Sequence, residues 1–105
     1  MRASYARALP RGWRPTAQIF TALGDPHRQR IVLMFKDGER LSIGEIVATS
    51  PLSRSAIAHH LRVMREAGVL KCARAGKEML YWPDPAAVRS ALDAVRAYLD
   101  KEFPQ

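Results

Sequence analysis

The feature that most constrains the fold is the segment SRSAIAHHLRVMREAGVL, residues 53–70. Its apolar residues recur at spacings of four and three, on one face of an α-helix: Ile57, Leu61 and Met64. Ser53 is a favourable N-cap residue, and Gly68 is a favourable residue just past a helix end. The pattern predicts an amphipathic helix over residues 54–67, with one buried face and one exposed face.

A shorter helix is predicted directly before it. Ser42 and Glu45 have the S-x-x-E spacing of a capping box, which satisfies backbone groups at a helix start. The following segment, IGEIVATS, runs to Pro51, so only about SPL separates the two helices. A short capped helix, a tight turn and a longer helix form a helix-turn-helix.

Two further helices are predicted before this motif. TAQIFTAL (16–23) carries apolar residues on one face and ends at Gly24. Asp25 followed by Pro26 is typical of a helix start. The expected buried side of that second helix is Ile31, Val32, Met34 and Phe35.

After Gly68 the hydrophobic period changes. VLKCARAGKEMLYW (69–82) favours two short strands around a turn at residues 75–77. Asp84 with Pro85 then starts a final helix. One apolar stripe of that helix is expected to face the domain: Val88, Leu92, Val95 and Leu99. Together these elements predict a mainly α-helical fold with a small β-hairpin, a winged helix-turn-helix of order α-α-α-α-β-β-α.

A chain of 105 residues suits one domain and buries a modest core, which a second subunit would extend. We expect an N-terminal arm over 1–14 and a winged helix-turn-helix domain over 15–103. Ala91, Ala94, Tyr98 and Phe103 widen the apolar stripe of the last helix. The predicted dimer interface consists of Ile19, Phe20, Leu92, Val95, Tyr98 and Leu99. The alternative is that the last helix only closes the core of one protomer.

The net charge of +7 is unevenly distributed. Residues 1–14 contain four arginines and no acid, and residues 53–82 contain six basic residues against Glu66 and Glu78. Basic patches attract polyanions, of which nucleic acid is the usual case. Since no apolar run approaches the ~20 residues of a membrane span and no signal-peptide core is evident, we expect a cytoplasmic protein.

The exposed face of the helix over 54–67 suits a DNA major groove, because small residues permit close approach. Arg54 can bond guanine, Ser55 and His59 can reach base edges, and Arg62 and Arg65 are suited to phosphates. A cationic hairpin tip would reach the adjacent minor groove or its phosphates. The predicted DNA-contacting residues are Ser53, Arg54, Ser55, Ala58, His59, Arg62, Arg65, Lys71, Arg74 and Lys77, with Lys71 expected near the tip. The alternative for both surfaces is a solvated polar face.

The adjacent histidines do not favour a metal site. On a helix they point about 100° apart, whereas zinc chelation on one helix uses a spacing of four. His27 is the only other histidine, and no nucleophile or paired-carboxylate motif supports catalysis. We therefore expect neither metal, cofactor nor enzymatic activity. His59 is predicted to face DNA, whereas His60 lies nearer the core and either holds the helix in place or touches a phosphate.

The sequence resembles the ArsR/SmtB family of bacterial winged-helix repressors. The resemblance covers roughly residues 16–100 and rests on ALGDPHRQRIVLMF (22–35), LSIGEIV (41–47), LSRSAIAHHLRVMREAGVL (52–70) and GKEMLYWPDP (76–85). It implies a homodimer, with the first and last helices at the interface, that represses transcription by binding a palindromic operator. It also implies a recognition helix over 54–66 and a wing over 69–82.

The chain departs from the family's sensor motifs. Ser42 and Gly44 stand where the cysteines of a thiolate motif similar to ELCVCDL would stand, and residues 85–105 contain no histidine for a zinc site. A small organic ligand or a partner protein is left open as the effector. One alternative is a thiol switch at Cys72, which Cys72→Ser would test. Another is a protein-interaction module, which would show no DNA sequence preference at physiological salt.

Overall fold

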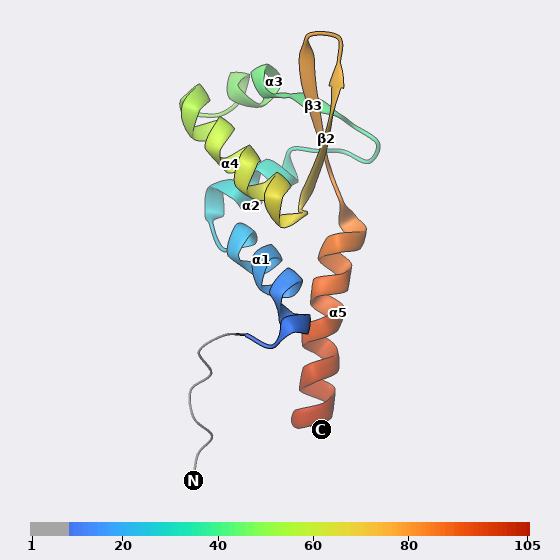
Figure 1. Ribbon diagram of the computed structural model, residues 1–105. Helices are drawn as coiled ribbons and strands as arrows, with labels where there is room; N and C mark the ends of the chain where they lie inside the picture. The colour runs from blue at the N-terminus through green and yellow to red at the C-terminus, as the bar shows by residue number, and fades with distance from the viewer. Residues whose placement is uncertain (1–8) are drawn as a thin grey trace.

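The computed structural model describes residues 9–105, so residues 1–8 of the arm expected over 1–14 lie outside the described range (Figure 1). The elements in chain order are a 3₁₀ turn at Arg11–Trp13, α1 (Arg14–Leu23), α2 (Pro26–Leu33), β1 (Leu41–Ser42), α3 (Ile43–Ala48), α4 (Arg54–Ala67), β2 (Leu70–Ala75), β3 (Glu78–Pro83) and α5 (Pro85–Glu102). This order confirms the predicted winged helix-turn-helix. None of the helices within residues 9–105 is both long and apolar enough to cross a membrane.

The first helix begins earlier than predicted. α1 includes Arg14, and a 3₁₀ turn precedes it, so part of the proposed arm is helical. The ring of Trp13 meets the ring of Tyr98 edge-on, with centroids 5.7 Å apart, and this contact joins the 3₁₀ turn to α5. The described end of the arm is therefore packed onto the domain.

The hairpin is part of a three-stranded antiparallel sheet of order β1-β3-β2. β1 pairs with β3, with Leu41 opposite Tyr81. This third strand was not predicted, because two residues are too short to show the alternation of a strand. The β2–β3 turn contains Gly76 at a φ of 65°, a conformation that glycine adopts readily.

Helix α4 is anchored as the periodicity predicts. Ile57, Leu61 and Met64 are buried in a core that also includes Ile46 of α3. The hydroxyl of Ser53 accepts the Ala56 N–H at 3.1 Å and caps the start of α4. With one face held in the core, α4 presents its other face outward.

Helix α5 faces the domain through a different side from the one predicted. Ala91 is its buried residue, whereas Leu92 and Leu99 are 54% and 48% exposed. The expected inward stripe is therefore wrong beyond Val88, which packs against the core. A small residue at the contact lets α5 lie close to α1, as Figure 1 shows, and the larger apolar side chains then point away.

Candidate nucleic-acid interface

The outward face of α4 carries the residues predicted to contact DNA. Arg54, Ser55, Ala58 and His59 are all exposed, and so are Arg62 and Arg65. One guanidinium nitrogen of Arg62 lies 3.3 Å from Nδ1 of His59, so these two polar groups form one patch. The exposed Ser53 is also predicted to contact DNA, but its hydroxyl is already engaged in capping α4.

The wing holds two of the three predicted cations at its tip. Arg74 and Lys77 are exposed; Arg74 lies near the end of β2, and Lys77 lies in the turn that joins β2 and β3. Lys71 was expected near them, but it pairs with Trp82 at the base of the hairpin. Its Nζ lies 3.8 Å from a carboxylate oxygen of Asp84, the N-cap residue of α5, so the expected position of Lys71 is wrong.

A second surface lies on the side of α5 that faces away from the core. An open apolar groove is lined by Leu92, Val95, Leu99 and Phe103, with charged residues along its edges. Phe20 of α1 and Tyr98 are also exposed. Ile19 is 4% exposed and belongs to the core of the protomer, so it offers little surface to a partner.

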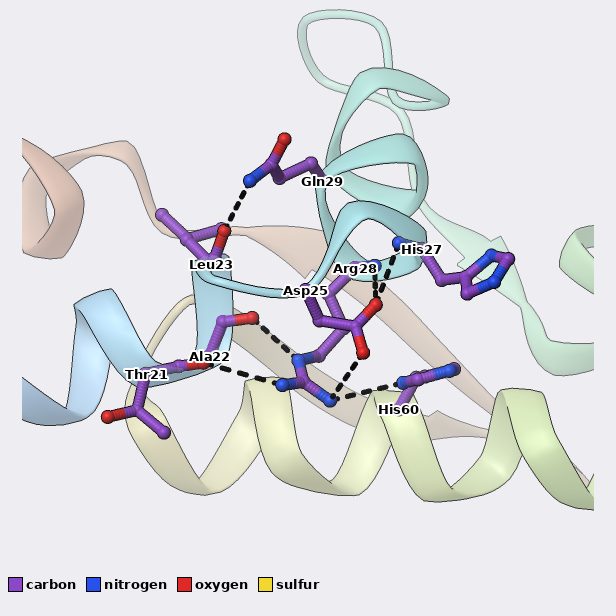
Figure 2. Close-up of polar contacts among 8 residues, drawn as sticks. All are labelled: Thr21, Ala22, Leu23, Asp25, His27, Arg28, Gln29 and His60. Atoms are coloured by element: carbon purple, nitrogen blue, oxygen red, sulfur yellow. Dashed lines mark hydrogen bonds and ion pairs between the residues drawn. The ribbon is translucent and has the colours of Figure 1, made fainter.

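A polar junction connects α4 to the other helices (Figure 2). The guanidinium of Arg28, on α2, donates to the Ala22 carbonyl at 2.6 Å and to the Thr21 carbonyl at 3.4 Å. One of its nitrogens lies 3.2 Å from Nδ1 of His60, on α4. The same nitrogen lies 3.7 Å from a carboxylate oxygen of Asp25, which caps α2. One side chain thus contacts the end of α1, the start of α2 and the middle of α4.

The junction shifts the pKa values of its two other titratable members. Burial lowers the pKa of His60, and the positive charges of Arg28, His59 and His27 lower it further against the opposing effect of Asp25. Burial raises the pKa of Asp25, but the backbone N–H groups of His27 and Arg28 and nearby positive charge outweigh it, so this pKa is lowered. Both shifts favour a neutral imidazole beside an ionised carboxylate.

Comparison with known proteins identifies the family of this chain. The family model for the bacterial regulatory proteins of the arsR family matches residues 25–71. The HTH-type transcriptional regulator Rv2034 of Mycobacterium tuberculosis is 34% identical over 84 residues, covering 77% of this chain and 78% of that protein. The chain belongs to the ArsR family. ArsR-family proteins are DNA-binding transcriptional regulators, and repressors are among them.

Two further relatives agree with this ArsR-family assignment. The transcriptional repressor SdpR of Bacillus subtilis is 25% identical over 83 residues, covering 79% of this chain and 91% of that protein. The solved structure of an ArsR-like transcriptional regulator from Rhodococcus sp. RHA1 superposes with a TM-score of 0.73 at 25% identity. That superposition covers 88% of this chain and 86% of the Rhodococcus chain.

Ser42 and Cys72 are the residues that the sequence relates to regulation. The hydroxyl of Ser42 accepts the Glu45 N–H at 3.2 Å and so caps α3. Cys72 is partly buried on β2, opposite Tyr81. Among residues 9–105, no three His, Cys, Asp or Glu side chains are grouped closely enough to hold a metal ion.

Arg28 was not predicted to have a role. The sequence spacing could have indicated its contact with Asp25, since Asp25 is the N-cap of α2 and Arg28 lies three residues later in the first turn. The position of His60 was foreseen only as near the core, with two possible roles. Its contact with Arg28 joins residues 32 positions apart, and a single sequence does not reveal such a pair.

Proposed function

We propose that this ArsR-family protein binds a palindromic operator as a homodimer and represses transcription, with α4 in the major groove. The observation that carries the proposal is the exposed face of α4, where Arg54, Ser55, Ala58 and His59 lie opposite a fully buried stripe. Arg54 and Ser55 occupy the N-terminal end of α4, the part of a recognition helix that reaches base edges. The small side chain of Ala58 permits close approach to bases.

The wing supplies contacts of a different kind. Arg74 and Lys77 at its tip are suited to phosphates, and contacts to phosphates depend on salt and tolerate changes of sequence. Affinity thus comes from both surfaces, whereas discrimination among sequences comes from α4. Each direct base contact of α4 is expected to be worth ~1–3 kcal/mol.

The proposed dimer uses the apolar groove on α5 together with Phe20 and Tyr98. Leu92, Leu99 and Phe103 are large apolar side chains that the protomer leaves uncovered. A two-fold axis beside α5 would bring together two copies of one surface, as in an isologous dimer. Two recognition helices would then read half-sites about 34 Å apart, one turn of DNA.

The proposal includes no metal and no enzymatic step. At the family's thiolate position, the hydroxyl of Ser42 is engaged as a helix cap, and Gly44 has no side chain to offer. The effector is therefore proposed to be a small organic ligand or a partner protein, unless the protein only regulates its own gene.

Paired charge variants test the assigned DNA face. Arg54→Ala and Lys101→Ala each remove one positive charge, but Lys101 lies on α5, away from α4 and the wing. Arg54→Ala is expected to weaken operator binding by ~1–3 kcal/mol and to relax the preference at one base pair. His59→Ala should act in the same way at another base pair, and Lys101→Ala should bind almost as the wild type does. Equal affinities for Arg54→Ala, His59→Ala and the wild type would show that α4 is not the reading surface.

A further inference from the structure

The contact between Arg28 and His60 is more than a surface hydrogen bond. The Arg28 side chain is 13% exposed and contacts three helices at once. Its bond to the Ala22 carbonyl fills an acceptor that the end of α1 leaves without a helical partner. Its bond to the Thr21 carbonyl adds to the one that this carbonyl accepts from the Gly24 N–H. A shift of α4 away from Arg28 would break the only link in this junction that reaches the DNA-binding helix (Figure 2).

The chemistry of this contact fixes the state of the imidazole. A guanidinium only donates hydrogen bonds, so Nδ1 of His60 must accept and carries no proton. His60 is then neutral, with its hydrogen on Nε2. A proton added to Nδ1 would remove the bond and set two cations against each other at 3.2 Å.

We propose that the Arg28–His60 junction positions the recognition helix, and that specific DNA binding requires His60 to be neutral. The inference rests on the proposed function, because it assumes that α4 reads DNA. His60 is a positioning residue: it follows His59 directly, so a displacement of its backbone moves the neighbouring base-facing side chain. Arg28 also contacts the end of α1, the helix that carries Phe20 of the proposed dimer surface, and thus connects the two surfaces.

Four charged or titratable groups face His60. Asp25 favours the protonated form of His60, whereas Arg28, His27 and His59 oppose that form. The ring of His60 lies 5.9 Å from that of His27 and 5.8 Å from that of His59, so both rings are close enough to act on its charge. Because His59 is itself proposed to contact DNA, a test must separate the effect of His60 from that of His59.

Operator affinity between about pH 5.5 and 8, at constant ionic strength, provides that test. In His60→Asn, the amide oxygen can take the position of Nδ1 and accept from Arg28 without titrating. His27 and His59 remain in both proteins, so the ratio of wild-type to His60→Asn affinity isolates His60. We expect similar affinities near pH 8 and a wild-type affinity about tenfold lower, relative to His60→Asn, at the acid end. Parallel pH profiles would overturn the proposal.

Two further variants distinguish positioning from stability. His60→Leu removes the acceptor and is expected to lose about tenfold in operator affinity near pH 8 while remaining folded. Gln29→Ala removes a 2.5 Å bond between α2 and the Leu23 carbonyl that does not reach α4, so it should keep the wild-type pH profile. Wild-type affinity in His60→Leu, or a flattened profile in Gln29→Ala, would contradict the proposal.

The junction can also be tested without DNA. The pKa of His60, followed by NMR in the free protein, should lie below its ordinary value and rise in Arg28→Met, which removes a neighbouring positive charge. An unchanged pKa would show that the junction does not form. Absence of operator binding by the wild type near pH 8, with the pKa response intact, would refute the proposed function and with it the role of the junction in DNA binding.

Discussion

Replacing Leu99 by alanine should weaken the dimer by an amount that its exposure predicts. Leu99 is 48% exposed in the protomer. Burying a whole leucine side chain is worth about 1.5–3 kcal/mol, so covering the exposed half contributes about 0.8–1.5 kcal/mol. In a two-fold interface the residue occurs twice, and Leu99→Ala should therefore cost roughly 1.5–3 kcal/mol, which raises the dimer dissociation constant roughly 10- to 150-fold.

Sedimentation equilibrium would measure this change directly, with Leu33→Ala as the matched control. Leu33 lies on α2 and is 82% exposed, so the same substitution there removes a similar side chain outside the proposed interface. The control should leave the dissociation constant within about twofold of wild type. If Leu99→Ala and Leu33→Ala behave alike, the α5 groove is not the interface. Leu99→Asp, which adds a carboxylate at the same place, should leave monomers at concentrations where the wild type is dimeric.

Four other results are expected. Gly68→Ala should lower the free energy of unfolding in urea by about 1–2 kcal/mol, because Gly68 ends α4 at a φ of 90°. Lys77→Ala should weaken binding to all sequences alike and reduce the salt slope by about one, whereas an unchanged slope would remove the wing tip from the phosphates. The urea midpoint should fall on acidification, because acid protonates the two groups whose pKa is lowered in the folded protein. The contribution of His60 to the free energy of unfolding is complete above its ordinary pKa of 6.5 and is lost as the pH falls through its lower folded pKa. The contribution of Asp25 is lost in the same way below its ordinary pKa of 3.8. Neither zinc nor a chelator should alter operator affinity, and a metal-dependent change would overturn the proposed absence of a metal site.

Helices with strong periodicity could be predicted from the sequence, and pairs of distant residues could not. The stripe of Ile57, Leu61 and Met64 located α4 and its exposed face, because one buried face fixes the direction of the other. On α5 both faces carry apolar residues, so periodicity alone did not identify the inward one. The burial of Ala91 identifies the inward face, since a small side chain allows the helices to approach.

The same limits applied to the candidate site. The exposure of Arg54 and His59 followed from helical geometry, but the distance of Lys71 from the hairpin tip depended on the length of β2. A strand of six residues separates its two ends by about 17 Å, so Lys71, the second residue of β2, lies far from the turn that follows Ala75. The junction of Arg28 with His60 depends on how α2 and α4 pack, which neither helix encodes by itself.

Selection of genomic DNA fragments by the purified, reduced and metal-free protein at about 150 mM salt tests the central claim most directly. Sequence-specific binding by a dimer predicts recovery of an inverted repeat whose half-sites lie about one helical turn apart. Arg54→Ala should enrich this repeat more weakly and with a relaxed preference at one base pair of each half-site. Recovery of no common sequence, or of the same sequence by Arg54→Ala with equal enrichment and an unrelaxed preference, would contradict the claim that α4 reads DNA as part of a dimer.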